Sequence, residues 1–352
     1  MRMMSRLILI LITLLAGAEG GGCAGKAKPI FPTPNPPIVW PEPPEPMRIR
    51  YIGQLATSTE LKRPVVGLEA LGGAIFGKKS AHAMLTPFAV CTDGDDRIFV
   101  ADSNAQVVHV FDLTTRRYAQ WTPKKPQRFS QPVGVAYDPG LKRLYVSDSI
   151  GATVHIFNAT NGKHLGHTLP NLFSRPTGIF FDRRSKRLLV TDTTAHNVTV
   201  CAPNGDPITR FGRRGDLMGE FNFPTSVTVD SNGLVYVCDA LNFRIQQFTP
   251  DYKPIRPIGL KGDMPGYFGQ PKAVACDSQN HLYVVDAQFE AVQIFSAIGQ
   301  LLLNFGEEGH RPGQFWLPTG IFIDRRDRII VADGYNRRIQ LFQYIPEATP
   351  QP

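Results

Sequence analysis

The chain has 352 residues, of which 42% are hydrophobic and 19% are charged, a balance that fits a globular protein. Its 32 Gly and 30 Pro residues suit an all-β chain with many turns. No CxxC or CxxCH spacing occurs, which excludes a zinc ribbon, a redox dithiol and a c-type haem attachment site.

Residues 1–22 have the pattern of a signal peptide. Arg2 and Arg6 precede a continuous apolar run, Leu7–Leu15, and small residues follow. The run is too short to span a bilayer, and its flanks are those of an export signal. We therefore predict export to the cell envelope.

The cleavage site has two readings. Gly20-Gly21-Gly22-Cys23 is similar to a bacterial lipobox, although Gly20 stands where Leu is usual. We predict lipidation of Cys23 and a periplasmic or outer-membrane-attached lipoprotein, held on the membrane by that anchor. In the alternative, cleavage after Ala18 gives a secreted protein.

Residues 23–47 form a proline-rich segment that follows the anchor. Nine prolines lie between residues 24 and 47. This density favours extended polyproline II, which acts as a semi-rigid spacer. We predict a tether that holds the next domain away from a membrane.

Residues 48–86 combine a short strand pattern with an insertion. Ile52-Gly53 recurs as Phe211-Gly212, Ile258-Gly259 and Phe305-Gly306, and each later copy lies 13 residues before a proline. From Ile52 to the corresponding proline the distance is 35 residues, an excess of 22 that includes Lys78 and Lys79. Insertions of this kind often carry function, and a packed cover over the neighbouring structure is the equal alternative.

Residues 87–342 contain six copies of one unit. Its opening prolines lie 44 to 48 residues apart: Pro87, Pro132, Pro176, Pro224, Pro271 and Pro318. An aspartate follows each proline by six residues, and a second ends a strand-like run such as LYVSD or IIVAD: Asp102, Asp148, Asp192, Asp239, Asp286 and Asp333. Short β-branched or aromatic runs bounded by Gly, Asp and Asn predict strands with tight turns.

This unit resembles the NHL repeat, whose signature runs P-x-G-[IV]-x-[IV]-D and then [IL]-Y-V-x-D-x-x-N-x-R-[IV]-Q-x-F. The resemblance covers roughly residues 48–345. It implies an all-β six-bladed β-propeller of four-stranded antiparallel blades. The D-x-x-N-x-R element is complete only at Asp239-Asn242-Arg244 and Asp333-Asn336-Arg338.

The propeller needs one strand from the N-terminal side. The last repeat stops after its third strand, at Phe342, so we predict that residues 48–53 supply the fourth strand of that blade and close the ring. Residues 346–352 remain as a tail.

The repeated aspartates have a structural interpretation. Those that open the first hairpin of each repeat are placed to accept backbone N–H groups of the turn. For Asp239 with Arg244, and Asp333 with Arg338, we predict bidentate pairs that hold neighbouring loops together.

The sequence offers no convincing metal or nucleophile site. Cys91, Cys201, Cys238 and Cys276 are interpreted as buried thiols, with a Cys201–Cys238 bridge as a minor alternative. His196 lies in a loop that could face the central channel, as do metal ligands in lyases and lactonases of related architecture. We predict no metal and no other cofactor, and the alternative is a metal-dependent lyase or lactonase at the mouth of the channel.

One face of the predicted propeller is both basic and aromatic. The loops before strand one and after strand two share this face, and their candidate binding residues are Lys78, Lys79, Arg213, Arg214, Phe243, Phe289, Trp316 and Tyr335. Such a surface suits nucleic acid, and some eukaryotic NHL domains bind RNA, but export argues against that partner.

The opposite face is also basic, with Arg183, Arg184 and Arg325 among its residues, and the formal net charge is +8. We expect a monomeric, non-catalytic binding module for a protein or an anionic envelope polymer.

Overall fold

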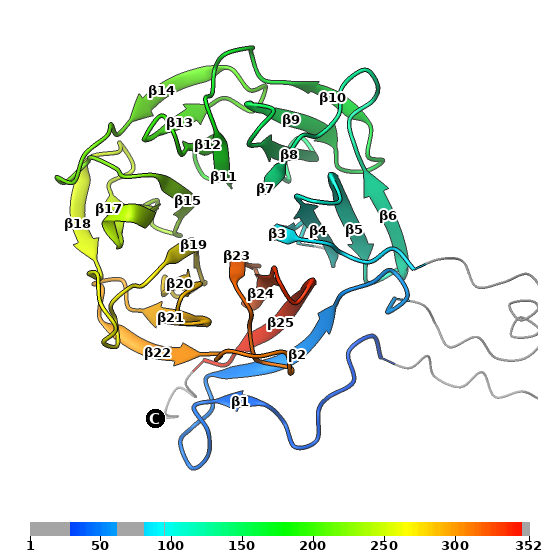
Figure 1. The fold of residues 1–352 in the computed structure, drawn as a ribbon, viewed down its shortest axis with the longest axis vertical. Helices are drawn as coiled ribbons and strands as arrows, with labels where there is room; N and C mark the ends of the chain where they lie inside the picture. The colour runs from blue at the N-terminus through cyan, green and yellow to red at the C-terminus, as the bar shows by residue number, and fades with distance from the viewer. Residues whose placement is uncertain (1–28, 62–80, 95, 347–352) are drawn as a thin grey trace, which may run out of the picture.

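The computed structural model describes residues 29–61, 81–94 and 96–346. In these ranges the chain forms 25 strands and one short 3-10 helix, arranged as six sheets around a central opening (Figure 1). The fold is therefore the predicted all-β propeller with four-stranded antiparallel blades.

The blades follow one another along the chain. Blade 1 is β3 (Pro87–Thr92), β4 (Arg97–Asp102), β5 (Val107–Asp112) and β6 (Arg117–Trp121); blade 2 is β7 (Pro132–Asp138), β8 (Arg143–Asp148), β9 (Thr153–Asn158) and β10 (His164–His167); blade 3 is β11 (Pro176–Asp182), β12 (Arg187–Asp192), β13 (Asn197–Cys201) and β14 (Pro207–Phe211).

The second half of the ring continues in the same order. Blade 4 is β15 (Pro224–Val229), β16 (Val235–Asp239), β17 (Arg244–Phe248) and β18 (Pro254–Ile258), with the helix η1 (Ala240–Asn242) between β16 and β17; blade 5 is β19 (Pro271–Cys276), β20 (Leu282–Asp286), β21 (Ala291–Phe295) and β22 (Leu301–Phe305); blade 6 contains β23 (Pro318–Ile323), β24 (Arg328–Asp333) and β25 (Arg338–Tyr344).

Burial changes from the inside of each blade to its outside. The second strands are almost entirely buried, because both faces of each sheet pack against neighbouring blades. The fourth strands lie at the rim, where β14 and β18 expose most of their residues. This explains the continuous apolar runs of the second strands and the mixed sequences of the fourth.

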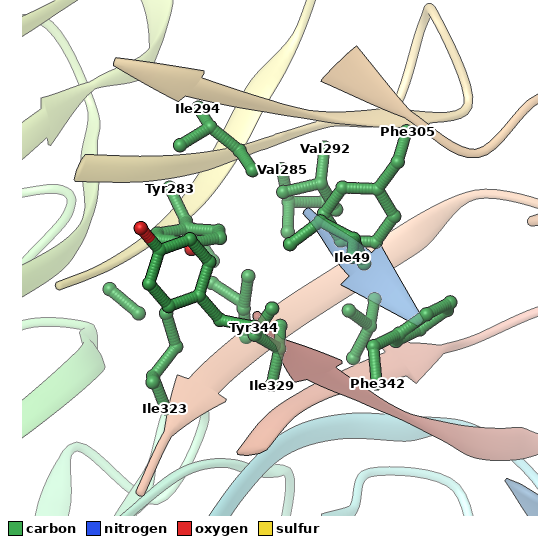
Figure 2. Packing of buried hydrophobic residues seen from close by; sticks show 14 of the residues in the cluster. Ile49, Tyr283, Val285, Val292, Ile294, Phe305, Ile323, Ile329, Phe342 and Tyr344 are labelled. Atoms are coloured by element: carbon green, nitrogen blue, oxygen red, sulfur yellow. The ribbon is translucent and has the colours of Figure 1, made fainter. Parts of the chain in front are cut away.

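Buried apolar side chains fill the spaces between blades. Between blades 5 and 6, Phe305, Phe315 and Phe342 contact one another with ring centroids 5.0 to 6.4 Å apart. Figure 2 shows Ile49 gathered with Phe305 and Phe342 in this cluster. The N-terminal strand thus shares a core with the end of the chain.

Strand β2 (Ile49–Leu55) lies in blade 6. It pairs antiparallel with β25, and Ile49 lies opposite Tyr344. The strand is two residues longer at its C-terminal end than the predicted residues 48–53. Blade 6 has a fifth strand as well, because β1 (Val39–Trp40) pairs with β2 outside it.

The described part of the proline-rich segment packs against the propeller, whereas the sequence predicted a free extended spacer. The Trp40 ring lies 5.6 Å from that of Phe305 and 5.8 Å from that of Phe342. Phe31 covers Gly53, where an added Cβ would lie 2.4 Å from Phe31 Cδ1. Apolar side chains among the prolines therefore anchor this segment to blade 6.

Several predicted features lie outside the described residues: the signal peptide, Cys23, Lys78 and Lys79 with most of the insertion, and residues 347–352. The described ranges contain no helix long and apolar enough to cross a membrane.

Candidate binding groove on the top face

The face that carries the loops before strand one and after strand two is called the top face below, and the opposite face is the bottom face. Three of the top loops share a pattern of glycines and a phenylalanine. Gly212, Gly259 and Gly306 have φ of 75 to 89°, and a Cβ on any of them would lie 2.1 to 2.3 Å from the phenylalanine nine residues later in its loop. Only glycine suits this position, because it accepts both the left-handed backbone and the ring above it.

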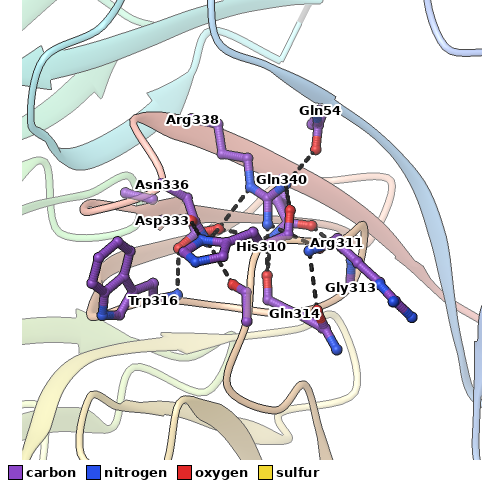
Figure 3. Close-up of polar contacts among 12 residues, drawn as sticks. Gln54, His310, Arg311, Gly313, Gln314, Trp316, Asp333, Asn336, Arg338 and Gln340 are labelled. Atoms are coloured by element: carbon purple, nitrogen blue, oxygen red, sulfur yellow. Dashed lines mark hydrogen bonds and ion pairs between the residues drawn. The ribbon is translucent and has the colours of Figure 1, made fainter.

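An aspartate at the end of strand two organises each complete repeat. In blade 6, Asp333 Oδ1 accepts a hydrogen bond from Trp316 N (2.8 Å). Its Oδ2 accepts bonds from Asn336 Nδ2 (2.9 Å), Arg338 Nε (2.7 Å) and Gln340 Nε2 (2.9 Å), as Figure 3 shows. A fully buried carboxylate is thus satisfied by three side chains and one backbone amide.

The arginine of this cluster reaches beyond the carboxylate. Arg338 Nη2 donates to the carbonyls of Arg311 (2.9 Å) and Gln314 (2.8 Å), and Nη1 donates to Gln54 Oε1 (2.8 Å) (Figure 3). The predicted bidentate geometry is therefore wrong in its detail: one nitrogen contacts the aspartate, and the others hold the loop from blade 5. We call this arrangement the clasp.

Blade 4 repeats the clasp. Arg244 Nε lies 2.9 Å from Asp239 Oδ2, and Arg244 Nη2 donates to the carbonyl of Leu217 (2.9 Å). All clasp groups are engaged with the protein itself, so both pairs hold loops in place.

A groove opens beside the blade 4 clasp, between blades 4 and 5 on the top face. Its walls come from the loops after β16, β18 and β20, and its volume is about 1050 Å³. Its lining includes Leu241, Phe243, Lys261, Lys272, Phe289 and Glu290. We call this the top groove.

Aromatic and basic side chains meet in the top groove. Lys261 Nζ lies 4.8 Å from the centroid of the Phe243 ring, a cation–π distance. Phe289 lines the same groove, and Leu241 beside it is 52% exposed. The structure thus brings together the predicted residues Phe243 and Phe289.

Lys272 lies in the floor of the top groove, half-buried. No hydrogen bond or ion pair reaches its ammonium from the part of the chain that the structure describes. Burial lowers the pKa of Lys272, because a charged amine loses hydration there. An ammonium in this position favours an incoming acidic group.

Lys272 was not among the predicted site residues, although the sequence held a signal for it. It directly follows Pro271, and the five other repeats place Phe88, Val133, Thr177, Thr225 or Thr319 at that position. A single charge in a column of apolar and threonine residues marks a site that packing alone does not explain.

Glu290 forms the far wall of the groove. Its Oε2 accepts a hydrogen bond from Leu317 N (2.7 Å). Burial raises the pKa of this carboxyl, and nearby Glu308 and Asp333 raise it further. Glu290 therefore holds the loop before β23, and the carboxylate whose charge acts on Lys272 is that of Asp286.

The other predicted binding residues lie apart from the groove. Trp316 and Tyr335 contact each other on top of blade 6, with ring centroids 5.4 Å apart, and are 41% and 58% exposed. Arg213 pairs with Glu220 (2.9 Å) on the loop before blade 4. Arg214 is exposed on the same loop and does not line the groove.

The remaining candidate groups are buried, except for Cys276, which is partly exposed and was wrongly predicted to be buried. Cys91, Cys201, Cys238 and Cys276 are free thiols, so the Cys201–Cys238 bridge does not form. His196 does not face the channel: it is 7% exposed, and its Nδ1 accepts a hydrogen bond from Phe223 N (3.2 Å). Within residues 29–61, 81–94 and 96–346, no three His, Cys, Asp or Glu side chains are grouped to hold a metal ion.

Comparisons with known proteins agree with this architecture. An NHL repeat is matched at residues 221–248, which run through most of blade 4. A search among curated proteins found no match.

Solved structures share the fold at low identity. Virginiamycin B lyase from Staphylococcus aureus superposes with a TM-score of 0.56 at 16% identity, covering 84% of this chain and 92% of the lyase. An auxiliary nutrient binding protein from Bacteroides thetaiotaomicron gives 0.59 at 12% identity, covering 74% and 69%. A chain of a nidogen–laminin complex gives 0.52 at 18% identity, covering 72% and 89%. These likenesses show the propeller fold alone.

Proposed function

We propose that this NHL-repeat six-bladed propeller is a non-catalytic binding module that takes an acidic group, flanked by apolar surface, into the top groove. The ligand class is an acidic segment of a protein or an anionic envelope polymer. One observation carries the proposal: Lys272 presents a half-buried ammonium at the floor of an aromatic-walled groove, and no described residue forms a hydrogen bond or ion pair with it.

The chemistry of the groove favours this ligand. An acidic side chain that reaches Lys272 gains a charge-assisted hydrogen bond in a partly dehydrated site. Phe243, Phe289 and Leu241 offer apolar contact beside it. Interfaces commonly combine such a buried anchor with an exposed polar rim, which Lys261 and Asp263 supply here.

The cellular setting is part of the proposal. An exported propeller with a lipidated Cys23 presents the groove in the envelope, where acidic polymers and partner proteins occur. The apolar contacts of Phe31 and Trp40 hold the described part of the proline-rich segment against blade 6.

The test measures fluorescence anisotropy of labelled peptides in which Asp or Glu alternates with Leu and Phe. Matched peptides carry Asn and Gln instead, and polygalacturonate serves as an anionic polymer. We expect Lys272→Gln to weaken binding of the acidic ligand about tenfold, which corresponds to about 1.4 kcal/mol.

Two further variants locate the site. Phe243→Ala tests the aromatic wall, and Lys253→Gln is the control, because Lys253 is an exposed lysine on the bottom face that pairs only with Asp251 (3.3 Å). Equal affinity for the acidic and amide peptides, or full affinity in Lys272→Gln, would refute the proposed function.

A further inference from the structure

A second cavity runs along the axis of the propeller. It has a volume of about 550 Å³ and is lined by the innermost strands β3, β7, β11, β15, β19 and β23, which Figure 1 shows around the central opening. This volume lies within the usual range of sites for small molecules. We call it the channel.

Apolar side chains line much of the channel. Val90, Val135, Ile179, Val274 and Ile321 come from five different blades. The threonines near the top end are tied to the protein: Thr225 Oγ1 donates to the carbonyl of Lys272 (2.8 Å), and Thr319 Oγ1 donates to that of Pro87 (3.1 Å). The walls therefore favour an apolar occupant over a strongly hydrated one.

Two arginines lie at the bottom end of the channel. Arg183 follows β11 in blade 3 and Arg325 follows β23 in blade 6, so they come from opposite sides of the ring. Both residues line this one cavity. Burial lowers the pKa of Arg183, and the positive charge of Arg325 lowers it further. Among the described residues, neither guanidinium has a hydrogen-bond or ion-pair partner.

The carboxylates of this mouth are engaged elsewhere. Asp182 accepts from Ser185 N (3.3 Å), and Asp230 accepts from Asn232 N (2.9 Å) and Tyr236 Oη (3.1 Å). Asp324 accepts from Arg328 Nε (2.7 Å).

Asp277 and Asp138 are also held within their own hairpins. Asp277 accepts from Tyr283 Oη (3.1 Å) and contacts His281 Nδ1 (2.8 Å). Asp138 attracts Arg183 only at a distance, and its Oδ1 accepts from Gly140 N (2.8 Å). Each of these aspartates accepts hydrogen bonds within its own hairpin, and among the described residues none of them forms an ion pair with Arg183 or Arg325.

We propose that the channel binds a free aliphatic carboxylate, with its hydrocarbon chain between the innermost strands and its carboxylate between Arg183 and Arg325. The planar guanidinium matches a carboxylate in shape and charge. Each methylene that enters the channel should raise the affinity about fourfold, because apolar surface leaves water. The channel shares Thr225 and Lys272 with the top groove at its top end, whereas the two arginines lie at its bottom end. The carboxylate site between them extends the proposed function to a second ligand.

Isothermal titration calorimetry with octanoate, decanoate and dodecanoate tests this site. We expect saturable binding whose affinity rises with chain length, with a negative change in heat capacity from apolar burial. Decanol should bind at least tenfold more weakly than decanoate, because it lacks the charge.

Substitutions of the two arginines test where the carboxylate of the ligand binds. Arg325→Gln, alone and with Arg183→Gln, should weaken decanoate binding at least tenfold and leave binding of acidic peptides in the top groove unchanged. Arg117→Gln is the matched control, since it removes the same charge from an exposed position on the outer strand β6. Because Arg325 is exposed, its substitution should preserve the fold, which a thermal unfolding curve checks.

Three results would overturn the proposal. The first is an absence of decanoate binding to the unmodified protein. The second is undiminished binding in the double variant, including the case in which Lys272→Gln alone abolishes it and so places the carboxylate at the top end. The third is an affinity that does not depend on chain length, which would leave the channel unoccupied.

Discussion

Blades 4 and 6 and blades 1 and 2 hold the aspartate at the end of strand two with different chemistry. In blades 4 and 6 the third strand presents Gln246 or Gln340, whose Nε2 donates to the aspartate at 3.0 or 2.9 Å. In blade 1 the same position is His109, 3.1 Å from Asp102, and in blade 2 it is His155, 3.9 Å from Asp148. One set of blades uses a neutral amide and the other an imidazole. Burial lowers the pKa of His155 in blade 2, so part of the response to acid should come from that blade.

The loops above these blades differ in the same way. The glycine-patterned loops stand before blades 4, 5 and 6, and the top groove lies among them. The blades that follow glycine-patterned loops thus carry the candidate binding surface, whereas in blades 1 and 2 a histidine replaces the glutamine that contacts the aspartate. Three predictions test this contrast.

The largest effect should come from the clasp of blade 6. Asp333→Ala leaves the buried Arg338 guanidinium without its carboxylate, and we expect a loss of about 3–5 kcal/mol in the free energy of unfolding. Asp286→Ala in blade 5 is the matched control, because Asp286 accepts only backbone bonds, from Gly269 (2.8 Å), Gln270 (2.8 Å) and Gln288 (3.0 Å).

Urea unfolding measures both variants. The control should lose about 1–3 kcal/mol, the cost of unsatisfied buried donors. Equal losses in the two variants would show that the arginine adds nothing to the clasp.

The next effect concerns pH and blade 2. Burial, and to a smaller extent the charge of the neighbouring His164, lower the pKa of His155 to about 4. The folded state therefore binds the proton less well than the unfolded state. The resulting stability is complete above the ordinary pKa of 6.5 and is lost as the pH falls towards about 4, by about 3 kcal/mol in all.

Replacing His155 with glutamine, the residue at this position in blade 4, isolates the contribution of the imidazole to the pH dependence. His155→Gln should flatten the acid dependence of the free energy of unfolding, measured by urea titration across this pH range. A slope as steep as that of the unmodified protein would assign the acid sensitivity to other groups.

The smallest effect concerns His281 in blade 5. Its contribution to stability is lost as the pH rises, whereas that of His155 is lost as the pH falls. The hydrogen bond from His281 to Asp277 raises the pKa of His281. Its contribution to stability is therefore complete below 6.5 and is lost as the pH rises through the folded-state pKa. His281→Asn should cost less than about 1 kcal/mol in mild acid and nothing in mild base, as followed by the melting temperature.

Much of the fold was predictable because its signal is local and repeated. The proline and the two aspartates recur in register in all six repeats, and strands with that spacing have few alternatives. The proline-rich segment was not predictable in the same way. Trp40 packs on Phe305 and Phe342, residues near the other end of the chain, and nothing near Trp40 in sequence indicates that contact.

The site was predictable only in part, for a related reason. Phe243 and Phe289 stood out as aromatic residues in loops, and the structure brings them to one groove. Glu290 accepts a hydrogen bond from Leu317 N in the loop before β23, and no sequence spacing indicates that partner. Arg183 and Arg325 come from blades on opposite sides of the ring, so their electrostatic interaction requires the closed propeller. Such pairings follow from the closed fold and not from spacing.

The pairing of β2 with β25 has a consequence for how the protein matures. During synthesis the N-terminal side emerges first, so Ile49–Leu55 cannot pair with Arg338–Tyr344 until that last strand has been made. Contacts between the two ends of a chain are slow to form because the intervening loop must close. Until then the incomplete ring has two exposed sheet edges, and chaperones that cover exposed strands would act during that interval.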